Sequence, residues 1–117
     1  MSVKVMYHSC GSIIPIIEDL VEIGVDILEP LQPKADGMDP AFLKSKYGDR
    51  LCFHGGIDEQ DLLPHGSPEQ VKQEVEQTCK TLGRNGGYIV MAAHAFQPDI
   101  PCENIVAMYE AVDKAHG

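Results

Sequence analysis

The sequence predicts an α/β fold in which parallel strands alternate with helices. Short apolar segments alternate with longer amphipathic ones four times along the chain, and glycine or proline marks the boundaries between them. This alternation implies a parallel sheet with right-handed crossovers. At 117 residues, of which 44% are hydrophobic, residues 1–117 fit a single domain with its own core. Two architectures agree with this count: a small open α/β sandwich, or half of a (β/α)8 barrel, which needs at least about 200 residues.

The first half of the chain contains two of the predicted units. Residues 3–7 form the first strand, and the helix after it has an apolar stripe that ends before Gly24. The stripe has helical spacing and consists of Ile13, Ile16, Ile17, Leu20 and Val21. Residues 25–28 form the second strand. Asp39 and Pro40 are the N-cap and the first residue of a short helix that ends at Gly48.

The second half repeats the pattern. Residues 51–53 form the third strand, and Gly55 and Gly56 after it are typical of a tight strand exit with positive φ. A capping box at Ser67 begins a helix that continues to Gly83. Residues 88–92 form the fourth strand, and the last helix has an apolar face made of Ile105, Met108, Tyr109 and Val112.

Charge and segment composition exclude several classes of function. The formal charge of −9 has the wrong sign for binding nucleic acid or an anionic membrane surface. No apolar run has the length of a membrane span, and the N-terminus lacks the features of a signal peptide. We therefore expect a soluble, cytoplasmic protein. The four cysteines are Cys10, Cys52, Cys79 and Cys102, and no two of them have the spacing of a paired motif. This favours buried thiols or metal ligands over disulfides.

Reactive polar side chains gather at one end of the predicted strands. Each strand is followed by two of them, in the order His8 and Cys10, Glu29 and Gln32, His54 and Asp58, His94 and Gln97. The turns that lead from each helix into the next strand carry no such groups. Barrels and open α/β sheets build their sites at the carboxyl ends of their strands. This asymmetry indicates a functional site there.

The most specific motif is His8-Ser9-Cys10. Residues two apart in an extended segment project to the same side, so imidazole and thiolate can converge on one ion. This donor pair suits zinc, and a catalytic zinc takes about three protein ligands, for which His94 is the natural third. The alternative interpretation is a buried cysteine beside a loop histidine; the pair alone favours that interpretation, and its position at a strand end makes the two level.

The other candidates also have two interpretations. Glu29 is either an acid or base of the site or a solvated carboxylate. His54 precedes two glycines whose amides can approach a ligand, although a tight turn explains the glycines as well.

Several segments together resemble the uroporphyrinogen decarboxylase superfamily, nearly end to end and in the right order. They are residues 8–12, 25–32, 37–40, 55–58 and 86–89, with His94 and residues 101–105. The resemblance covers the C-terminal third or so of a full-length member. It implies the last four units of a (β/α)8 TIM barrel, so that this fold is equivalent to the C-terminal half of such a barrel.

The resemblance implies one of two chemistries. Cobalamin-dependent methyltransferases of the superfamily hold zinc with an H-x-C pair and a later cysteine, and activate a thiol acceptor. His8 and Cys10 match that pair, and His94 stands where the later cysteine would be. The metal ligands would then be His8, Cys10 and His94, and methylcobalamin or a corrinoid protein would supply the methyl group. Glu29, His54 and Asp58 would be catalytic, and Gln32 and Gln97 would bind substrate.

The alternative is decarboxylation of uroporphyrinogen III to coproporphyrinogen III, a step of porphyrin biosynthesis. The family's substrate-binding arginine and catalytic aspartate lie in the N-terminal half, which this chain does not contain. Arg50 and Arg84 are both predicted at the other end of the strands. Four acetate carboxylates need cationic partners, so methyl transfer fits better. A third interpretation is a non-catalytic, truncated half-barrel. We expect either a homodimer or pairing with a separate N-terminal half-barrel to complete the fold.

Overall fold

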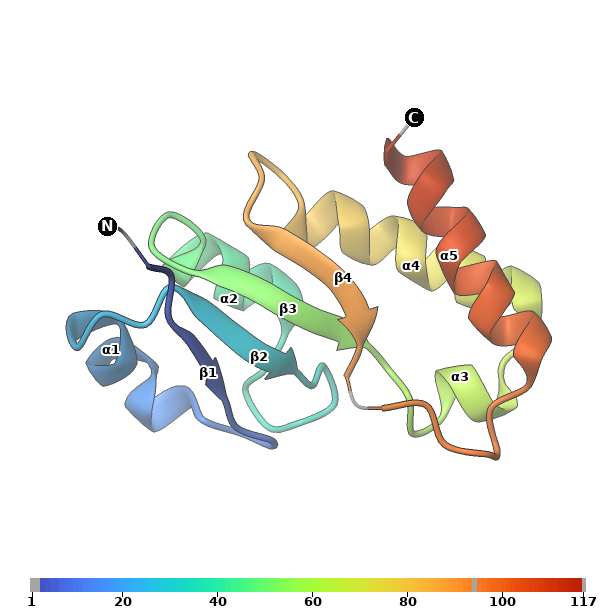
Figure 1. Cartoon of the computed structure of the whole chain (residues 1–117), viewed down its shortest axis with the longest axis horizontal. Coiled ribbons are helices and arrows are strands. Elements are labelled where there is room, and N and C mark those ends of the chain that lie inside the picture. Colours follow the sequence, from blue (N-terminus) through green and yellow to red (C-terminus); the bar gives the residue numbers. More distant parts are fainter. Residues whose placement is uncertain (1–2, 94, 117) are drawn as a thin grey trace.

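The sheet has the predicted strand order and direction. The computed structural model describes residues 3–93 and 95–116, and in it four strands pair in parallel in the order β1-β2-β3-β4 (Figure 1). The strands are β1 (Met6–His8), β2 (Ile27–Leu31), β3 (Cys52–Ile57) and β4 (Tyr88–Ala92). Four βα units in chain order confirm the predicted fold class.

The helices are α1 (Ile14–Glu22), α2 (Pro40–Tyr47), α3 (Leu62–His65), α4 (Pro68–Leu82) and α5 (Cys102–His116). Of these, α2 and α4 begin at the predicted capping residues. The Asp39 carboxylate accepts from the Phe42 amide at 3.0 Å at the start of α2. Ser67 and Gln70 form the complete capping box of α4. The short α3 was not predicted, because four residues are too few to show a periodic pattern.

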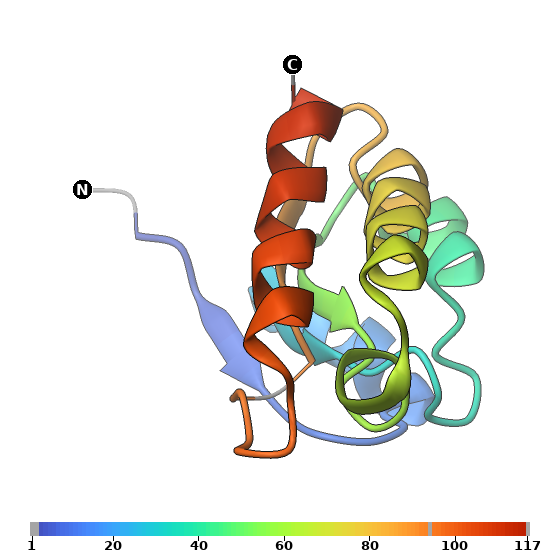
Figure 2. The ribbon, with the colours of Figure 1, turned by 90° about the vertical axis from the view of Figure 1, so that its right-hand side faces the viewer.

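The helices cover one face of the sheet (Figure 2). One core cluster packs Leu28 and Phe53 against α1 and α2. A second cluster joins Ile57 and Ala92 to α4 and α5, with Met108 fully buried in it. Residues that alternate with these along the strands point away from the helices.

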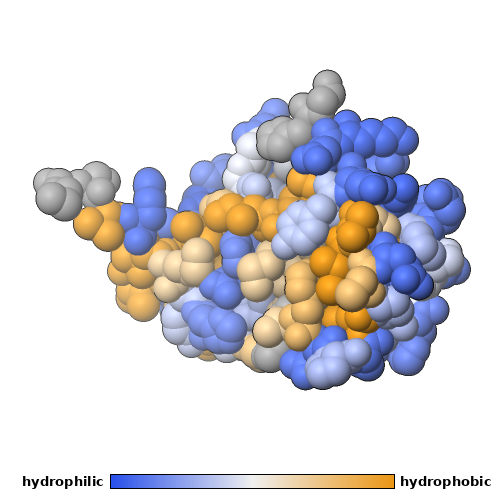
Figure 3. Space-filling view, turned by 45° about the vertical axis from the view of Figure 1, so that its right-hand side comes forward, coloured by the Kyte–Doolittle hydropathy of each residue, from blue (hydrophilic) through white to orange (hydrophobic). Residues whose placement is uncertain are grey.

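That opposite surface, called the open face here, carries residues of all four strands. Its members are Met6, His8, Ile27, Glu29, His54 and Ile89. Met6 and Ile89 are 46% and 41% exposed, and the strand edges of β1 and β4 have no partner among the described residues. Hydrophobic residues also form a band across the side of the molecule seen in Figure 3, between hydrophilic ones. Unpaired parallel edges and exposed apolar side chains are typical of a sheet that continues into further strands.

The strand boundaries differ from the prediction in two ways. The first two strands begin and end later along the chain, so His8 and Glu29 lie within β1 and β2. The third strand does not end at Phe53: it continues through His54 to Ile57. Gly55 and Gly56 have the expected positive φ values of 108° and 90°, but inside the strand, so the predicted exit there was wrong.

Within the described residues, every helix is too short or too polar to cross a bilayer.

Candidate functional site

The His8 and Cys10 side chains converge at the carboxyl end of β1. His8 is the last residue of the strand, and Ser9 after it remains tied to β2 through a 2.8 Å hydrogen bond from its amide to the Glu29 carbonyl. The His8 Nε2 atom lies 3.8 Å from the Cys10 Sγ atom. The extended backbone therefore brings the imidazole nitrogen and the thiol sulfur together, as the two-residue spacing predicted.

Glu29 lies between two histidines on the open face. Its Oε1 atom is 3.5 Å from Nδ1 of His8 and 3.8 Å from Nδ1 of His54. The Glu29 and His54 side chains are only 18% and 13% exposed, whereas that of His8 is 59% exposed. Nδ1 of His54 is buried, and no described group forms a hydrogen bond with it. The three strands thus gather two imidazoles around one carboxylate oxygen.

Strand register produces this arrangement. His8 pairs directly with Glu29, and Leu28 pairs with Phe53, which places Glu29 beside His54. The pairing of β2 with β3 then shifts, so that Leu31 pairs with Gly55. Glu29 lies at this irregularity. β-Bulges and related irregularities commonly re-aim a side chain next to a functional site.

Gln32 supports the loop that follows Cys10. Its side-chain oxygen accepts a hydrogen bond from the Gly11 amide. Gln32 and Gly11 also line a small cavity of about 210 Å³ at the carboxyl ends of the strands, together with Asp58. Two further predicted site residues therefore lie at the expected end of the sheet, in a cavity that the residue after Cys10 also lines.

Asp58 forms a separate ionic cluster with Lys34 and Asp61. It follows β3 directly and accepts hydrogen bonds from the amides of Gln60 and Leu62 at 3.1 and 3.0 Å, so it caps the start of α3. Lys34 Nζ lies 3.3 Å from Asp58 and also contacts the Asp61 carboxylate. Burial acts to raise the pKa of Asp58, but the two amides and Lys34 outweigh it and hold the pKa below its ordinary value.

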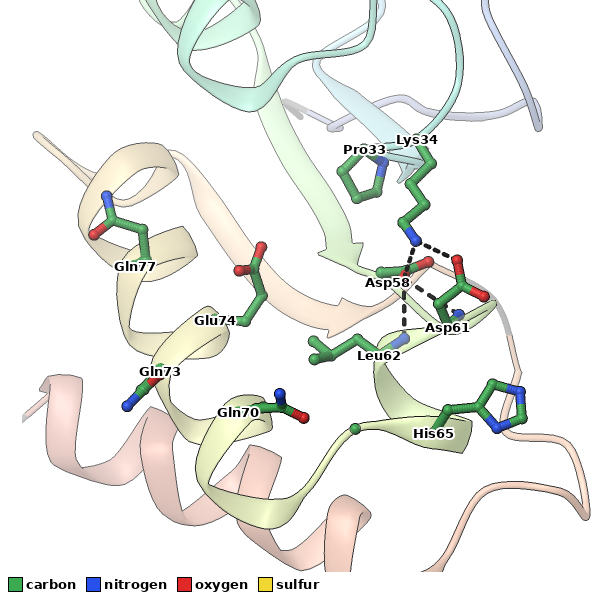
Figure 4. Close-up of a pocket in the computed structure, with 11 residues that line it drawn as sticks. Pro33, Lys34, Asp58, Asp61, Leu62, His65, Gln70, Gln73, Glu74 and Gln77 are labelled. Carbon is green, nitrogen blue, oxygen red and sulfur yellow. Dashed lines mark hydrogen bonds and ion pairs between the residues drawn. The ribbon is translucent and has the colours of Figure 1, made fainter.

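This ionic cluster lies at one end of a groove on the surface (Figure 4). The groove has a volume of about 820 Å³ and runs between α3, α4 and the segment that follows β2. The glutamine side chains of α4 line one side of the groove: Gln70, Gln73 and Gln77. Lys34 was missed by the sequence analysis: it lies among prolines in a loop without periodicity, and only the fold brings it to Asp58.

One predicted site residue lies apart from the others, and another falls outside the described residues. Gln97 lies in an exposed loop before α5, and no described contact joins its side chain to His8, Glu29 or His54. His94, the predicted third zinc ligand, lies outside the described residues. In residues 3–93 and 95–116, no three His, Cys, Asp or Glu side chains lie close enough together to hold a metal ion.

Arg50 lies away from this site, as predicted. It precedes β3, at the amino end of the sheet, where its Nη1 atom donates to Glu18 of α1 at 2.6 Å. The pKa of the Glu18 carboxyl is lowered by this hydrogen bond from Arg50. Arg84 likewise precedes β4. Neither arginine is thus positioned for an anionic substrate at the carboxyl ends.

Comparison with known proteins agrees with this fold. A solved methyltransferase from Methanosarcina mazei superposes with a TM-score of 0.74 at 25% sequence identity, over 97% of this chain and 32% of the methyltransferase. The uroporphyrinogen decarboxylase of Serratia proteamaculans is 34% identical over 79 residues, which are 68% of this chain and 22% of that protein. That of Chlorobium phaeovibrioides is 30% identical over 100 residues, or 83% of this chain and 27% of that protein.

The chain thus spans about a quarter of the length of these curated relatives. The family model for uroporphyrinogen decarboxylase (URO-D) matches residues 1–115, nearly the whole chain. This extent agrees with the order of the motifs and with the four βα units. The chain therefore belongs to the uroporphyrinogen decarboxylase (URO-D) family.

Proposed function

We propose that this chain provides the zinc-binding side of a methyl-transfer site, which moves a methyl group between a corrinoid and a thiol-type acceptor. The observation that carries the proposal is the convergence of His8 Nε2 and Cys10 Sγ, 3.8 Å apart, at the carboxyl end of β1. The likeness to a methyltransferase from Methanosarcina mazei supports the same chemistry.

The two donors fit one edge of a zinc site. Typical zinc–nitrogen and zinc–sulfur bond lengths place two ligands of a tetrahedral ion about 3.6 Å apart. The observed separation of 3.8 Å is close to that edge. His8 and Cys10 would hold the ion, and a further ligand has to come from outside this pair, for which His94 remains the candidate.

The remaining residues would shape the site around the pair. Bound zinc would supply Lewis acidity that lowers the pKa of the acceptor thiol. Gln32, through its bond with the Gly11 amide, would hold the loop that carries Cys10. The cavity lined by Gln32 and Asp58 would receive part of a small-molecule substrate. A methylated corrinoid, when bound, would supply the methyl group that the acceptor sulfur takes up; the electron pair of the cobalt–carbon bond would stay with the corrinoid, and the thiol proton would be released.

Further βα units would complete the site. The open face exposes Met6 and Ile89, and the edges of β1 and β4 are unpaired within the described residues. Light scattering at micromolar concentration tests whether a second copy fills this place. Twice the 12.8 kDa mass of one chain would identify a homodimer. The mass of one chain would make a separate N-terminal half-barrel the required partner.

Metal analysis of the purified chain tests the zinc proposal. The protein is prepared without chelators or nickel affinity resin, beside the variants His8→Ala and Cys10→Ala. We expect about one zinc per wild-type chain and none in either variant. Cys102→Ala removes an exposed thiol on α5 and is the matched control, which should keep its zinc. A folded wild type that binds no added zinc would overturn the proposal.

The second candidate is decarboxylation of uroporphyrinogen, favoured by the names of the curated relatives. It would convert each acetate side chain to a methyl group with loss of carbon dioxide. Conversion by the metal-free chain, alone or with a separate N-terminal half, would establish it in place of methyl transfer. Zinc binding without turnover in either assay, even with that half added, would identify a non-catalytic half-barrel.

A further inference from the structure

Glu29 and Cys10 lie on opposite sides of the His8 imidazole. Cys10 Sγ faces Nε2 of the ring, whereas Glu29 Oε1 faces Nδ1. The lone pairs of these two nitrogens point away from each other, so an ion bound at Nε2 is out of reach of a carboxylate at Nδ1. The absence of any three-ligand group among the described residues agrees with this separation.

We propose that Glu29 is a positioning residue for His8, an inference that rests on the proposed zinc site. A carboxylate at Nδ1 favours the tautomer in which Nδ1 carries the proton. Nε2 then has its lone pair free and directed toward Cys10. Such carboxylate–histidine pairs orient metal-binding histidines and increase their basicity.

His54 holds the Glu29 carboxylate from the other side. Its Nδ1 approaches the same oxygen that faces His8, at 3.8 Å. Because this nitrogen is buried and has no described hydrogen-bond partner, Glu29 is the acceptor toward which it can donate. Contacts of this length commonly tighten once a site is loaded. A half-buried carboxylate that also contacts His54 has less freedom to turn away from His8.

Zinc affinity, measured by competition with a chelator, tests this role. Glu29→Gln should weaken zinc binding by about ten- to a hundredfold, and Glu29→Asp should restore part of the loss. His54→Phe should weaken it in the same direction by a smaller factor. The controls Glu22→Gln and His65→Phe make the same changes at exposed residues of α1 and α3 and should leave the affinity unchanged.

Cobalt substitution separates positioning from direct ligation. The absorption spectrum of bound Co²⁺ reports the number and type of its ligands. If Glu29 acts through His8, the Glu29→Gln variant keeps the spectrum of the wild type at saturating Co²⁺. A changed coordination spectrum would show that Glu29 is itself a ligand, and would overturn the inference.

The tautomer of His8 gives a readout that needs no metal. Nitrogen-15 NMR of the metal-free chain at a pH where His8 is neutral should show the proton on Nδ1 in the wild type. Glu29→Gln should reduce that population, and Glu22→Gln should not. An unchanged tautomer in Glu29→Gln would overturn the positioning role. If the wild type binds no zinc, the proposed function fails, but this spectrum still decides the role of Glu29.

Discussion

Replacing Gly55 with alanine is expected to lower the free energy of unfolding by about 3 kcal/mol or more. Gly55 has a φ of 108°, which side chains with a Cβ atom rarely adopt. A Cβ atom there would also lie 3.1 Å from the backbone nitrogen of Leu31. Because that neighbour is backbone within the adjacent strand, the contact can be relieved only by moving β2 or β3.

Gly24→Ala is the matched control for this variant. Gly24 has a similar φ of 102°, but a Cβ atom at that position has no neighbour within 4 Å. Gly24→Ala should therefore lower the free energy of unfolding only by the backbone strain at this φ, about 1 kcal/mol. Urea unfolding of the two variants and the wild type measures both effects. Equal losses would show that the β2–β3 contact relaxes freely, contrary to this argument.

The same close approach of β2 and β3 supports the candidate site. Gly55 pairs with Leu31 immediately after the register shift in which Glu29 lies. The Tyr88 hydroxyl also donates a hydrogen bond to the carbonyl of Gly55, which ties β4 to this part of β3. Burial raises the pKa of that hydroxyl well above its ordinary value, so Tyr88 also remains a donor in alkaline solution. The position of Glu29 relative to His54 thus depends on a strand contact that only glycine permits.

The fold was predictable because its signals are local. Each unit joins an apolar strand to a helix, glycines follow α1, α2 and α4, and the caps at Asp39 and Ser67 form as expected. The strand limits were less predictable, since Gly55 and Gly56 are typical of turns as well as of strands that approach another backbone closely. The local sequence does not distinguish a turn from such a strand. The distinction comes from the partner strand, whose Leu31 lies close to Gly55.

Only part of the candidate site was predictable, for a related reason. The convergence of His8 with Cys10 follows from two-residue spacing within one segment, which the sequence shows directly. The place of Glu29 between His8 and His54 depends on the register of three strands. In the sequence, Glu29 is 21 residues from His8 and 25 residues from His54. Lys34 reaches Asp58 through a loop whose path no periodicity predicts.

Replacing Asp58 with alanine is expected to lower the free energy of unfolding by about 2–3 kcal/mol near pH 7. The Asp58 residue is only 9% exposed, and its carboxylate accepts from the amides that begin α3 and faces Lys34. Alanine would leave those amides without their acceptor and Lys34 without one of its two partners. Chemical unfolding of the wild type and variant at neutral pH measures the loss.

The loss should also depend on pH in a defined direction. Because folding lowers the pKa of Asp58, the unfolded chain binds more protons in acid than the folded chain does. The stabilisation by Asp58 is therefore fully present at a pH above the pKa of the unfolded state, about 3.9. It disappears as the pH falls through the folded pKa, so the difference between wild type and Asp58→Ala should narrow below about pH 4.

Asp61→Ala separates the buried contacts of Asp58 from the surface ion pair that both residues make with Lys34. The Asp61 side chain is 69% exposed, so its loss should cost less than about 1 kcal/mol. Equal losses in the two variants would show that Lys34, rather than the amides at the start of α3, accounts for the stabilisation. A difference that stays constant between pH 7 and pH 3 would show that Asp58 stabilises the fold without its charge. We expect a large, pH-dependent loss of stability for Asp58→Ala and a small loss for Asp61→Ala. That result would show that Asp58 stabilises the carboxyl end of β3, next to the cavity that it lines.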